Sequence, residues 1–431
     1  MSDSAEMRTP SSSKPNIRGA DDREGLGNSP GSSMCRIDAI LLPGILRSMK
    51  WTTHSVSVRF ALWLNFVLMA IPVPAVFGQG AAMVSPELHR DGSVTFRLDR
   101  PGAREVLVAL AGLETPLKMS QTQGIWSVTS APLESGTYWY SYVVDGRAEL
   151  DPLNDDVTPN YQYLNSVVRV PGAGPEPWER AEVPHGEVHH HFYESKIVKG
   201  LPNGRSEYFV YTPPGYESHP GTIYPTLFLL HGLSQGAGDW TTMGGANFVL
   251  DNLIAQGKAK PMVVVMPLGY GDMALLGKGL TDPDFGRTAA TSTSLFKVAL
   301  MTEIVPRVER EYRVAKTRTG RAIAGASMGG FESLDIGLNS AGKDGTGSFT
   351  WVGGFSAPAQ SVDLPATSGE AAKLRLLWIS CGTGDPFIEP TRKLIGQLKG
   401  KGYAVKAVET PGAHIWPVWD RNLVDFVQLL F

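Results

Sequence analysis

Three side chains that lie far apart along the chain have the types needed for nucleophilic catalysis at an acyl group: Ser327, Asp385 and His414. A serine hydroxyl is a weak nucleophile near neutral pH, so an imidazole must take its proton and later deliver it to the leaving group. A carboxylate beside the imidazole holds the required tautomer and favours the cation that forms. Together the three residue types predict acyl transfer through a serine.

The proposed nucleophile lies in the stretch Gly325-Ala-Ser-Met-Gly329, which fits the pattern G-x-S-x-G. Ile323 and its small apolar neighbours predict a buried strand before it, and residues 331–337 predict a helix after it. A strand, a sharp turn and a helix in this order form a nucleophile elbow, in which small residues let strand and helix approach closely. The pattern also arises by chance in a chain with 48 glycines, so the residues downstream must support it.

Asp385 and His414 both follow predicted strands in the order that an elbow serine requires. Residues 374–380 form an apolar stretch that predicts a strand, and Asp385 comes just past its end. Residues 404–409 predict the next strand, and His414 follows the turn after it. The order serine, aspartate, histidine is more specific than the elbow alone, because three independent placements must coincide.

Other residues could fill some of these roles. Glu409 is an alternative acid, although it lies before the turn that delivers His414, and His231 is an alternative base. Asp385 could instead cap the helix that starts near Pro386. Asp385 and His414 remain the preferred pair.

A tetrahedral intermediate also needs backbone N–H donors for its oxyanion. Met328, next to the serine, is predicted to supply one, and the loop after the apolar strand 224–230 is predicted to supply the other. In that loop Leu233 is the first choice and Gly232 the second. Losing one donor typically costs about a hundredfold or more in rate.

Three nearby side chains are predicted to contact substrate: Trp240, Trp416 and His231. Trp416 and Trp419 flank His414 closely enough to wall a cleft, with at least one of them expected in the core. His231, at a strand end before a glycine, is also expected to support the oxyanion loop.

Residues 188–431 carry these motifs and alternate between strands and helices, the signature of a mostly parallel sheet covered on both faces. With the elbow, this pattern predicts an α/β-hydrolase fold. Besides the strands given above, residues 261–267 and 351–355 predict strands, and helices are predicted at 248–256, 300–312, 390–400 and 418–430. Residues 268–295 and 340–349 are expected to be surface loops lining the active-site mouth.

Residues 80–170 are predicted to form a small all-β, immunoglobulin-like sandwich, because short alternating stretches are separated by turn signals. Tyr138, Tyr140 and Tyr142 share one face of a strand, which is read as a packed core face, with sugar binding by this domain as the alternative. The proline-rich residues 171–187 predict a linker.

Residues 1–48 are rich in Ser, Gly, Pro and Asp and predict a disordered extension. Residues 49–78 have a basic start, an uncharged apolar run and a small residue near its end, which indicates a signal peptide and a secreted or periplasmic protein. A membrane anchor is the alternative, disfavoured by Pro72 and Pro74. Translation could start at Met1 or at Met49.

Composition restricts the remaining classes of function. The chain has 431 residues, 42% of them hydrophobic, which allows two or three domains with a large core. A net charge of −3 without a basic run disfavours nucleic-acid binding. The two cysteines are Cys35, in the leader, and Cys381, expected to be a buried small hydrophobe. The histidines at 185 and 189–191 are not expected to bind a metal, since neighbours on a strand point to opposite faces.

Four motifs resemble carbohydrate esterase family 1, the group that includes feruloyl esterases, acetylxylan esterases and the related enterochelin esterases. They are Leu229-Leu-His-Gly232, Gly325-Ala-Ser-Met-Gly-Gly330, Cys381-Gly-Thr-Gly-Asp385 and Gly412-Ala-His-Ile-Trp-Pro-Val-Trp419. The residues before the linker, from Trp126 to Pro152, resemble the early-set sandwich related to family 48 carbohydrate-binding modules.

The resemblance implies carboxylic-ester hydrolysis through an acyl-enzyme with no cofactor, with Ser327 as nucleophile, Asp385 as acid and His414 as base. The expected substrates are feruloyl or acetyl esters of plant polysaccharides or related glycosides. A siderophore esterase or an acyltransferase of the same fold is the alternative enzyme, and a non-catalytic carbohydrate-binding protein is the alternative from another class. The oligomeric state, homo-oligomers included, is left open.

Overall fold

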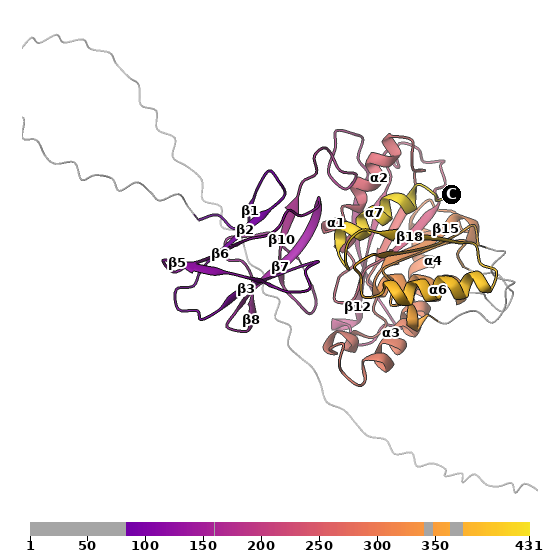
Figure 1. The fold of residues 1–431 in the computed structure, drawn as a ribbon. Coiled ribbons are helices and arrows are strands. Elements are labelled where there is room, and N and C mark those ends of the chain that lie inside the picture. Colours follow the sequence, from indigo (N-terminus) through magenta and orange to yellow (C-terminus); the bar gives the residue numbers. More distant parts are fainter. Residues whose placement is uncertain (1–82, 159, 340–347, 363–373) are drawn as a thin grey trace, which may run out of the picture. The chain divides into compact units, whose positions relative to one another are not determined.

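A computed structural model describes residues 83–158, 160–339, 348–362 and 374–431 (Figure 1), all of which belong to the compact unit Phe77–Phe431. The predictions for residues 1–78, both the disordered extension and the signal peptide, lie outside the described residues. Most of the predicted loop 340–349 does so too. None of the helices in the described ranges combines the length and the apolar character needed to cross a membrane.

Within the described residues, the N-terminal part forms two antiparallel sheets, one of four strands and one of six. The first has the order β1 (Glu87–Leu88), β2 (Val94–Asp99), β6 (Ile125–Thr129), β5 (Ser120–Thr122). The second has the order β4 (Leu117–Lys118), β3 (Val106–Leu110), β7 (Gly136–Val144), β10 (Asn165–Val170), β9 (Val157–Thr158), with β8 (Arg147–Glu149) beside β7. The rings of Phe96 on β2 and Tyr140 on β7 lie 4.7 Å apart, so the two sheets pack on each other as a sandwich.

The tyrosines of β7 form part of the sandwich core. Tyr138, Tyr140 and Tyr142 are all buried, which confirms the prediction of a core face. Their hydroxyl groups need partners in that position. Tyr140 and Tyr142 both donate to Asp151 Oδ2, at 2.8 and 3.1 Å, and Tyr138 donates to the Glu134 carbonyl at 3.0 Å.

The C-terminal part is built on a sheet with eight strands in the described ranges. Their order is β11 (Glu187–Glu194), β12 (Arg205–Thr212), β14 (Val263–Pro267), β13 (Thr226–Leu230), β15 (Arg321–Ala326), β16 (Trp351–Phe355), β17 (Leu376–Gly382), β18 (Val405–Thr410). All pairs from β14 to β18 are parallel, whereas β11 and β12 pair antiparallel at one edge. A mostly parallel sheet was predicted, but β12 was not located from the sequence, and neither was the antiparallel pairing of β11 with it.

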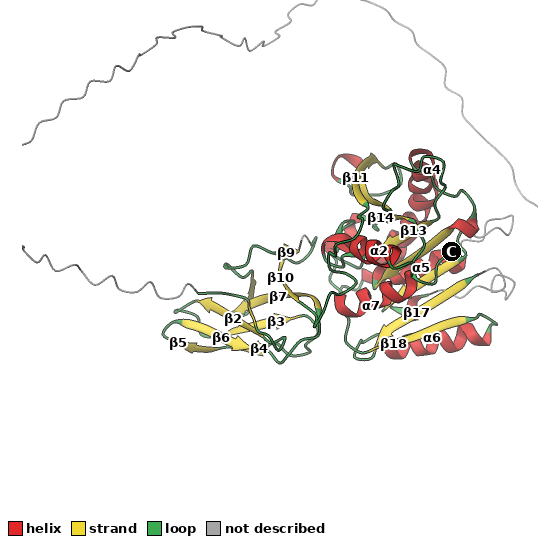
Figure 2. Cartoon of the chain, turned by 90° about the horizontal axis from the view of Figure 1, so that it is seen from above, coloured by secondary structure: helices red, strands yellow, loops and turns green. Residues whose placement is uncertain are grey.

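Helices cover both faces of this sheet (Figure 2). They are α1 (Asp239–Thr242), α2 (Ala246–Ala255), α3 (Phe285–Ala299), α4 (Val305–Glu311), α5 (Met328–Asn339), α6 (Ile388–Gly400) and α7 (Trp416–Val427). On β13, Leu227 and Leu229 belong to the core cluster that includes α2 and α7, whereas Phe228 and Leu230 belong to the cluster with α3 to α6. Because successive strand side chains point to opposite faces, a continuous apolar strand feeds both cores.

The prediction of a surface loop at 268–295 is wrong for its second half, which is helical in α3. This helix continues through a π-helical turn (Leu300–Ile304) into α4. Its first half is rich in Thr, Ser and Gly, which have weak helix propensity, and it buries Ser292 and Thr293 instead of an apolar stripe. The apolar periodicity that reveals other helices is therefore missing here.

The sandwich packs directly against α7. A Cβ atom at Gly136, the first residue of β7, would lie 2.7 Å from Pro417 Cγ. Glu134 forms an ion pair with Arg421 at 2.5 Å, and the rings of Trp139 and Trp419 lie 6.2 Å apart. The sandwich therefore contacts the helix that begins two residues after His414.

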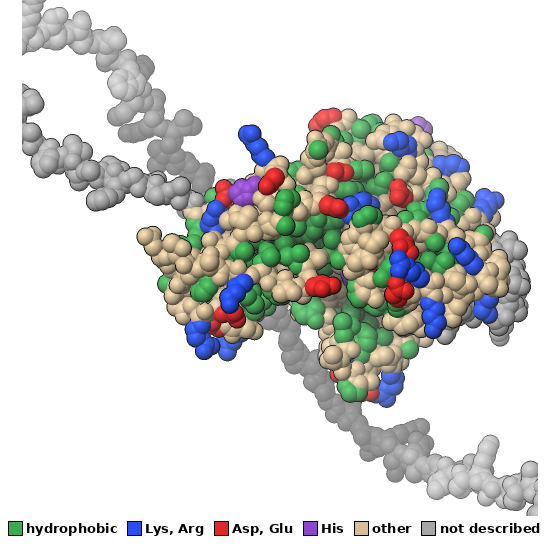
Figure 3. Space-filling model, viewed as in Figure 1, with side chains coloured by type: hydrophobic (Ala, Val, Ile, Leu, Met, Phe, Trp, Pro, Cys, Tyr) green, Lys and Arg blue, Asp and Glu red, His purple; other side chains and the backbone are tan. Residues whose placement is uncertain are grey.

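Side chains of both charge signs are scattered over the face drawn in Figure 3.

The histidines of β11 make protein contacts: His190 Nε2 lies 2.8 Å from Glu207, and His191 Nε2 lies 2.5 Å from the Tyr312 hydroxyl. In the described part of the chain, no three His, Cys, Asp or Glu side chains gather as metal ligands. Cys381 is fully buried, as expected.

Candidate active site

Ser327 lies in a sharp turn between β15 and α5, as the elbow pattern predicted. Its φ of +55° is in the left-handed region, where the backbone of any residue other than glycine is strained. The flanking glycines allow the turn: a Cβ atom at Gly325 would lie 2.6 Å from Gly329 backbone atoms, and one at Gly329 would lie 2.5 Å from the Leu230 carbonyl oxygen. Any larger residue at these two positions would separate the strand from the helix.

The structure brings the three predicted side chains together at the carboxyl ends of neighbouring parallel strands. His414 Nε2 lies 2.9 Å from Ser327 Oγ, and His414 Nδ1 lies 2.8 Å from Asp385 Oδ2. The loops after β17 and β18 are joined by a hydrogen bond from the Gly384 N–H to the Gly412 carbonyl, at 2.9 Å. Because Nδ1 donates to the carboxylate, Nε2 is free to accept the serine proton.

Asp385 is suited to remain an anion. Its Oδ2 faces His414, and its Oδ1 accepts the Phe387 N–H at 2.9 Å, so it braces the turn before α6 as well. Burial alone would raise the pKa of this carboxyl, but the hydrogen bond and charge of His414, with the Phe387 N–H, hold it below its ordinary value. The alternative acid, Glu409, is instead bound by Arg392 through both carboxylate oxygens, at 2.8 and 2.7 Å.

His231 has a structural position, and the prediction that it contacts substrate is wrong. It is 1% exposed, and its Nε2 accepts the Gly269 N–H at 2.9 Å. The proton must therefore be on Nδ1, which donates to the Gly232 carbonyl at 2.8 Å. Burial lowers the pKa of this imidazole to about 4, so it stays neutral and supports the loop that follows β13.

Two of the three predicted oxyanion donors have unoccupied N–H groups. Among the described residues no acceptor takes the N–H of Leu233 or of Met328, the first residue of α5. The third, Gly232, donates its N–H to Gln235 Oε1 at 2.6 Å, so the structure contradicts its assignment. Leu233 and Met328 remain the pair that can receive an oxyanion.

Ser327 opens into a cavity of about 250 Å³, which we call the ester cleft. The cleft is lined by Trp139, Thr158, Asn160, Tyr163, Asn165, Gly232, Leu233, Ser234, Gln235, Asp239, Ser327, His414, Trp416 and Trp419. Trp240 was predicted to contact substrate but is fully buried, and its indole N–H donates to the Leu230 carbonyl at 2.9 Å. Its ring packs edge-on against Trp416 at 5.2 Å, so it supports a cleft residue from behind.

Several cleft residues come from the sandwich and were not singled out from the sequence. Trp139 of β7 lies between the inward-facing Tyr138 and Tyr140, so strand alternation turns it outward, toward the cleft. Tyr163 is 60% exposed and belongs to the segment between β9 and β10. An outward tryptophan amid a buried strand face was the available signal.

Residues 160–163, before β10, also form hydrogen bonds to the loop after β13 that carries the Leu233 N–H. Asn160 Nδ2 donates to Ser234 Oγ at 2.9 Å, and the Tyr161 N–H donates to the Ser234 carbonyl at 2.8 Å. Ser234 has a φ of +68° and directly follows Leu233. The sandwich thereby helps to fix the direction of a backbone N–H that must point at the oxyanion.

We expect Asn160→Ala to lower kcat for small esters about fivefold, the equivalent of one net hydrogen bond of about 1 kcal/mol. The effect should fall on kcat more than on KM, because the bond orients a donor used in the transition state. Gln162→Ala is the comparison: its amide donates to the Leu276 carbonyl at 2.7 Å, not to Ser234. Equal losses of kcat in both variants would refute a specific role for Asn160.

Asp239, which lines the cleft, is a buried carboxyl whose contribution to the free energy of unfolding depends on pH. Burial raises its pKa from 3.8 to about 7, and its Oδ2 accepts the Gly236 N–H at 3.3 Å. Between these pH values the folded state holds a proton that the unfolded state releases, so this group costs about 1.4 kcal/mol of stability per unit of rising pH. The amide of Asn cannot ionise and keeps an acceptor for the same N–H.

The free energy of unfolding of Asp239→Asn, relative to wild type, should therefore increase as pH rises from about 4 to about 7 and then level off. Urea unfolding of both proteins at several pH values measures this difference. A difference that stays constant across that range would show that Asp239 ionises normally.

Comparisons with known proteins show which family and which folds the chain resembles. The chain is 27% identical over 361 residues to an "Endo-1,4-beta-xylanase/feruloyl esterase" of Xylanibacter ruminicola; the match covers 80% of this chain and 46% of that relative. The chain thus spans about half the length of the relative. Its fold is similar to that of the enterobactin esterase of Shigella flexneri, with a TM-score of 0.57 and 17% identity over 78% of this chain and 92% of that one.

A ferulic acid esterase of Anaeromyces mucronatus has the same fold, with a TM-score of 0.50 and 20% identity over 60% of this chain and 96% of that one. The model of one family, described as "Putative esterase", matches residues 201–429, more than half of the chain and the part that holds the serine, the aspartate and the histidine. The chain belongs to this esterase family.

Proposed function

We propose that the chain hydrolyses feruloyl or acetyl esters of plant polysaccharides or related glycosides through an acyl-enzyme on Ser327. The observation that carries this proposal is the hydrogen-bonded series Asp385–His414–Ser327, with distances of 2.8 and 2.9 Å, at the floor of the ester cleft. The xylanase and feruloyl esterase activities named for the relative from Xylanibacter ruminicola favour this substrate class.

In the first step, Ser327 Oγ attacks the ester carbonyl carbon while His414 Nε2 takes the hydroxyl proton. The N–H groups of Leu233 and Met328 stabilise the oxyanion, and Asp385 stabilises the imidazolium. His414 returns the proton to the departing alkoxide, which leaves as the alcohol. Water then attacks the acyl carbon while His414 Nε2 takes one of its protons. As the bond from the acyl carbon to Ser327 Oγ breaks, His414 returns that proton to Oγ and the acid leaves.

The walls of the ester cleft favour an aromatic acyl group over acetyl. Trp416 and Trp419 are only 1% and 2% exposed and pack edge-on at 5.2 Å, so they support the cleft wall from behind and offer no open ring face. Trp139 and Tyr163 line the cleft from the sandwich side. Indole and phenol rings offer a phenylpropenoyl group stacking partners that a methyl group cannot use.

A panel of small esters tests the acyl preference. Purified protein is assayed with methyl ferulate, p-nitrophenyl acetate and an ester of a catecholate acid, and kcat/KM is compared. The proposal predicts the highest value for methyl ferulate. A higher value for the catecholate ester would favour a siderophore esterase, a second candidate that the fold shared with the enterobactin esterase supports.

We propose the domain organisation and export route as well. Residues 1–48 would be an upstream extension, 49–78 a signal peptide, 80–170 an immunoglobulin-like early-set domain, 171–187 a linker and 188–431 the ester hydrolase domain. This organisation places the protein outside the cytoplasm, where ester-decorated polysaccharides occur. N-terminal sequencing of exported protein tests it: a chain that still begins within the first 48 residues would contradict cleavage.

A further inference from the structure

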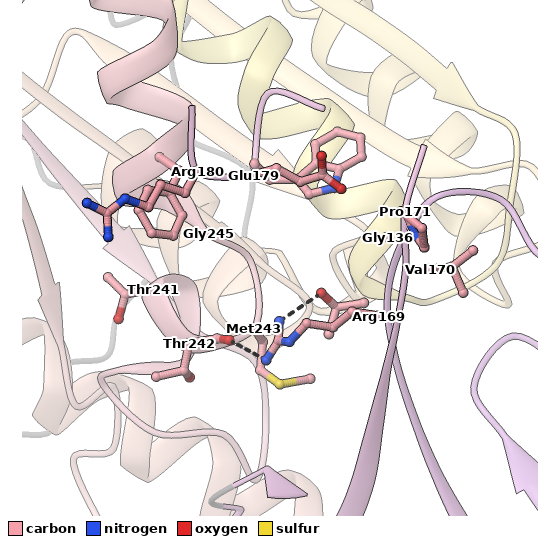
Figure 4. A pocket seen from close by; sticks show the side chains of 13 residues that line it. Gly136, Arg169, Val170, Pro171, Glu179, Arg180, Thr241, Thr242, Met243 and Gly245 are labelled. Atoms are coloured by element: carbon pink, nitrogen blue, oxygen red, sulfur yellow. Dashed lines mark hydrogen bonds between the residues drawn. The ribbon is translucent and has the colours of Figure 1, made fainter. Parts of the chain in front are cut away.

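A second cavity, of about 360 Å³, lies between the sandwich, the linker and α1, and we call it the seam pocket (Figure 4). It is lined by Gly136, Thr137, Arg169, Val170, Pro171, Trp178, Glu179, Arg180, Thr241, Thr242, Met243, Gly245 and Phe248. Its volume and its mixture of aromatic rings with a few polar groups are typical of a small-ligand site. None of the residues proposed for ester hydrolysis lies in it.

Arg169, whose side chain is 49% exposed, is oriented at one wall of the seam pocket by three hydrogen bonds. Its Nη1 donates to the Thr137 hydroxyl at 3.2 Å and its Nη2 to the Thr242 carbonyl at 3.1 Å (Figure 4). Its Nε donates to Asp156 Oδ2 at 3.1 Å. A guanidinium has five N–H donors, so two remain, and no acceptor in the described part of the chain takes them. A guanidinium oriented in this way, with unused donors, can bind oxygen atoms of a ligand.

The other walls supply the groups that proteins use to bind sugars. Trp178 and Phe248 are partly exposed, so their rings can contact the apolar face of a pyranose. Arg180 is exposed and makes no hydrogen bond or ion pair with another described residue. Glu179 and the hydroxyl of Thr241 add polar atoms beside the rings.

The seam pocket and the ester cleft are joined by the same two strands. Asn165 of β10 lines the ester cleft, and Arg169 of the same strand lines the seam pocket. Four residues of extended strand span about 13 Å, the length of two to three sugar units. On β7, Trp139 lines the ester cleft and Thr137 the seam pocket.

We propose that the seam pocket binds pyranose units of the glycan chain that carries the ester, two to three sugars from the bond that is cleaved. This inference rests on the proposed function, since it assigns the glycan of that substrate to a place. It predicts that the enzyme prefers a feruloylated oligosaccharide to methyl ferulate, because only the oligosaccharide reaches both sites. Binding at the seam pocket should lower KM and leave the chemistry at Ser327 unchanged.

The test compares kcat/KM for a feruloylated xylo-oligosaccharide with kcat/KM for methyl ferulate in full-length variants. We expect Trp178→Ala to lower the first value about five- to tenfold, mainly through KM, and to leave the second unchanged. Arg180→Ala, a change at an exposed side chain, should act in the same direction and guards against misfolding of the tryptophan variant. Phe192→Ala is the control, since Phe192 is 50% exposed on β11 and does not line the pocket.

The inference would be overturned if both pocket variants kept the wild-type ratio of the two kcat/KM values, whether both values stayed the same or both fell equally. The second measurement uses titration calorimetry to determine the affinity of the Ser327→Ala variant for an unesterified xylo-oligosaccharide. If the double variant Ser327→Ala, Trp178→Ala binds the oligosaccharide more weakly than Ser327→Ala alone, sugar binding at the seam pocket is supported even if methyl ferulate is not hydrolysed. Absence of hydrolysis would count against the proposed function, whereas absence of oligosaccharide binding would count against the pocket.

Discussion

Replacing Ser327 by alanine should lower kcat for methyl ferulate by about 10⁴-fold or more while the protein keeps its fold. Without Oγ no acyl-enzyme can form, and what remains is the stabilisation by the N–H groups of Leu233 and Met328. The alanine side chain is smaller than serine and removes no contact that the turn needs, since the Ser327 N–H bond to the Phe355 carbonyl, at 2.9 Å, is a backbone interaction.

The measurement is a steady-state assay together with thermal unfolding of both proteins. Ser294→Ala is the control, since Ser294 is exposed on α3 and bonds only to the Ala290 carbonyl of its own helix. A mass increase of wild-type protein incubated with a slowly turned-over ester, absent in Ser327→Ala, would identify the acylated residue. Substantial hydrolysis by Ser327→Ala would rule out Ser327 as the nucleophile.

Replacing Asp385 by asparagine should lower kcat by about 10⁴-fold, nearly as much as loss of the serine. An amide can still accept the Phe387 N–H, so the turn before α6 is kept. However, it cannot stabilise the imidazolium, and its NH₂ group favours the tautomer of His414 in which Nε2 carries the proton. That tautomer cannot accept the proton of Ser327.

Glu409→Gln is the matched control, because it removes the other carboxylate near the end of β18. Glu409 is bound to Arg392 and makes no contact with His414 in the described structure, so its loss should leave kcat nearly unchanged. If Glu409→Gln lost activity and Asp385→Asn kept it, the acid would be Glu409. The assay is the same hydrolysis of methyl ferulate, measured near neutral pH.

The core of the site was readable from sequence because each of its parts has a local pattern. The elbow needs small residues at Gly325 and Gly329 for steric reasons that act within a few residues of Ser327. Asp385 and His414 each follow an apolar strand, and neighbouring parallel strands end at the same edge of a sheet. Chain order together with strand pattern was therefore enough to group the three side chains.

The errors at the site concern hydrogen bonds, which sequence spacing does not encode. The use of the Gly232 N–H depends on the rotamer of the Gln235 side chain, and the role of His231 depends on the Gly269 N–H from a different strand connection. Trp240 was predicted to contact substrate, but its burial depends on packing against Trp416 on α7, which the local sequence does not show.

By itself, the sequence determined the nucleophile elbow, the order of acid and base, the tyrosine core face of β7 and the mostly parallel sheet, since short-range periodicity and turn chemistry govern all of these. Only the tertiary structure decided that Trp139 and Tyr163 wall the ester cleft, that Asn160 clasps Ser234, and that Arg169 and Trp178 share a pocket. The physical reason is that these contacts join the N-terminal sheets to segments of the C-terminal part of the same compact unit. Their geometry depends on how two folded surfaces meet, and no local pattern in the chain records that.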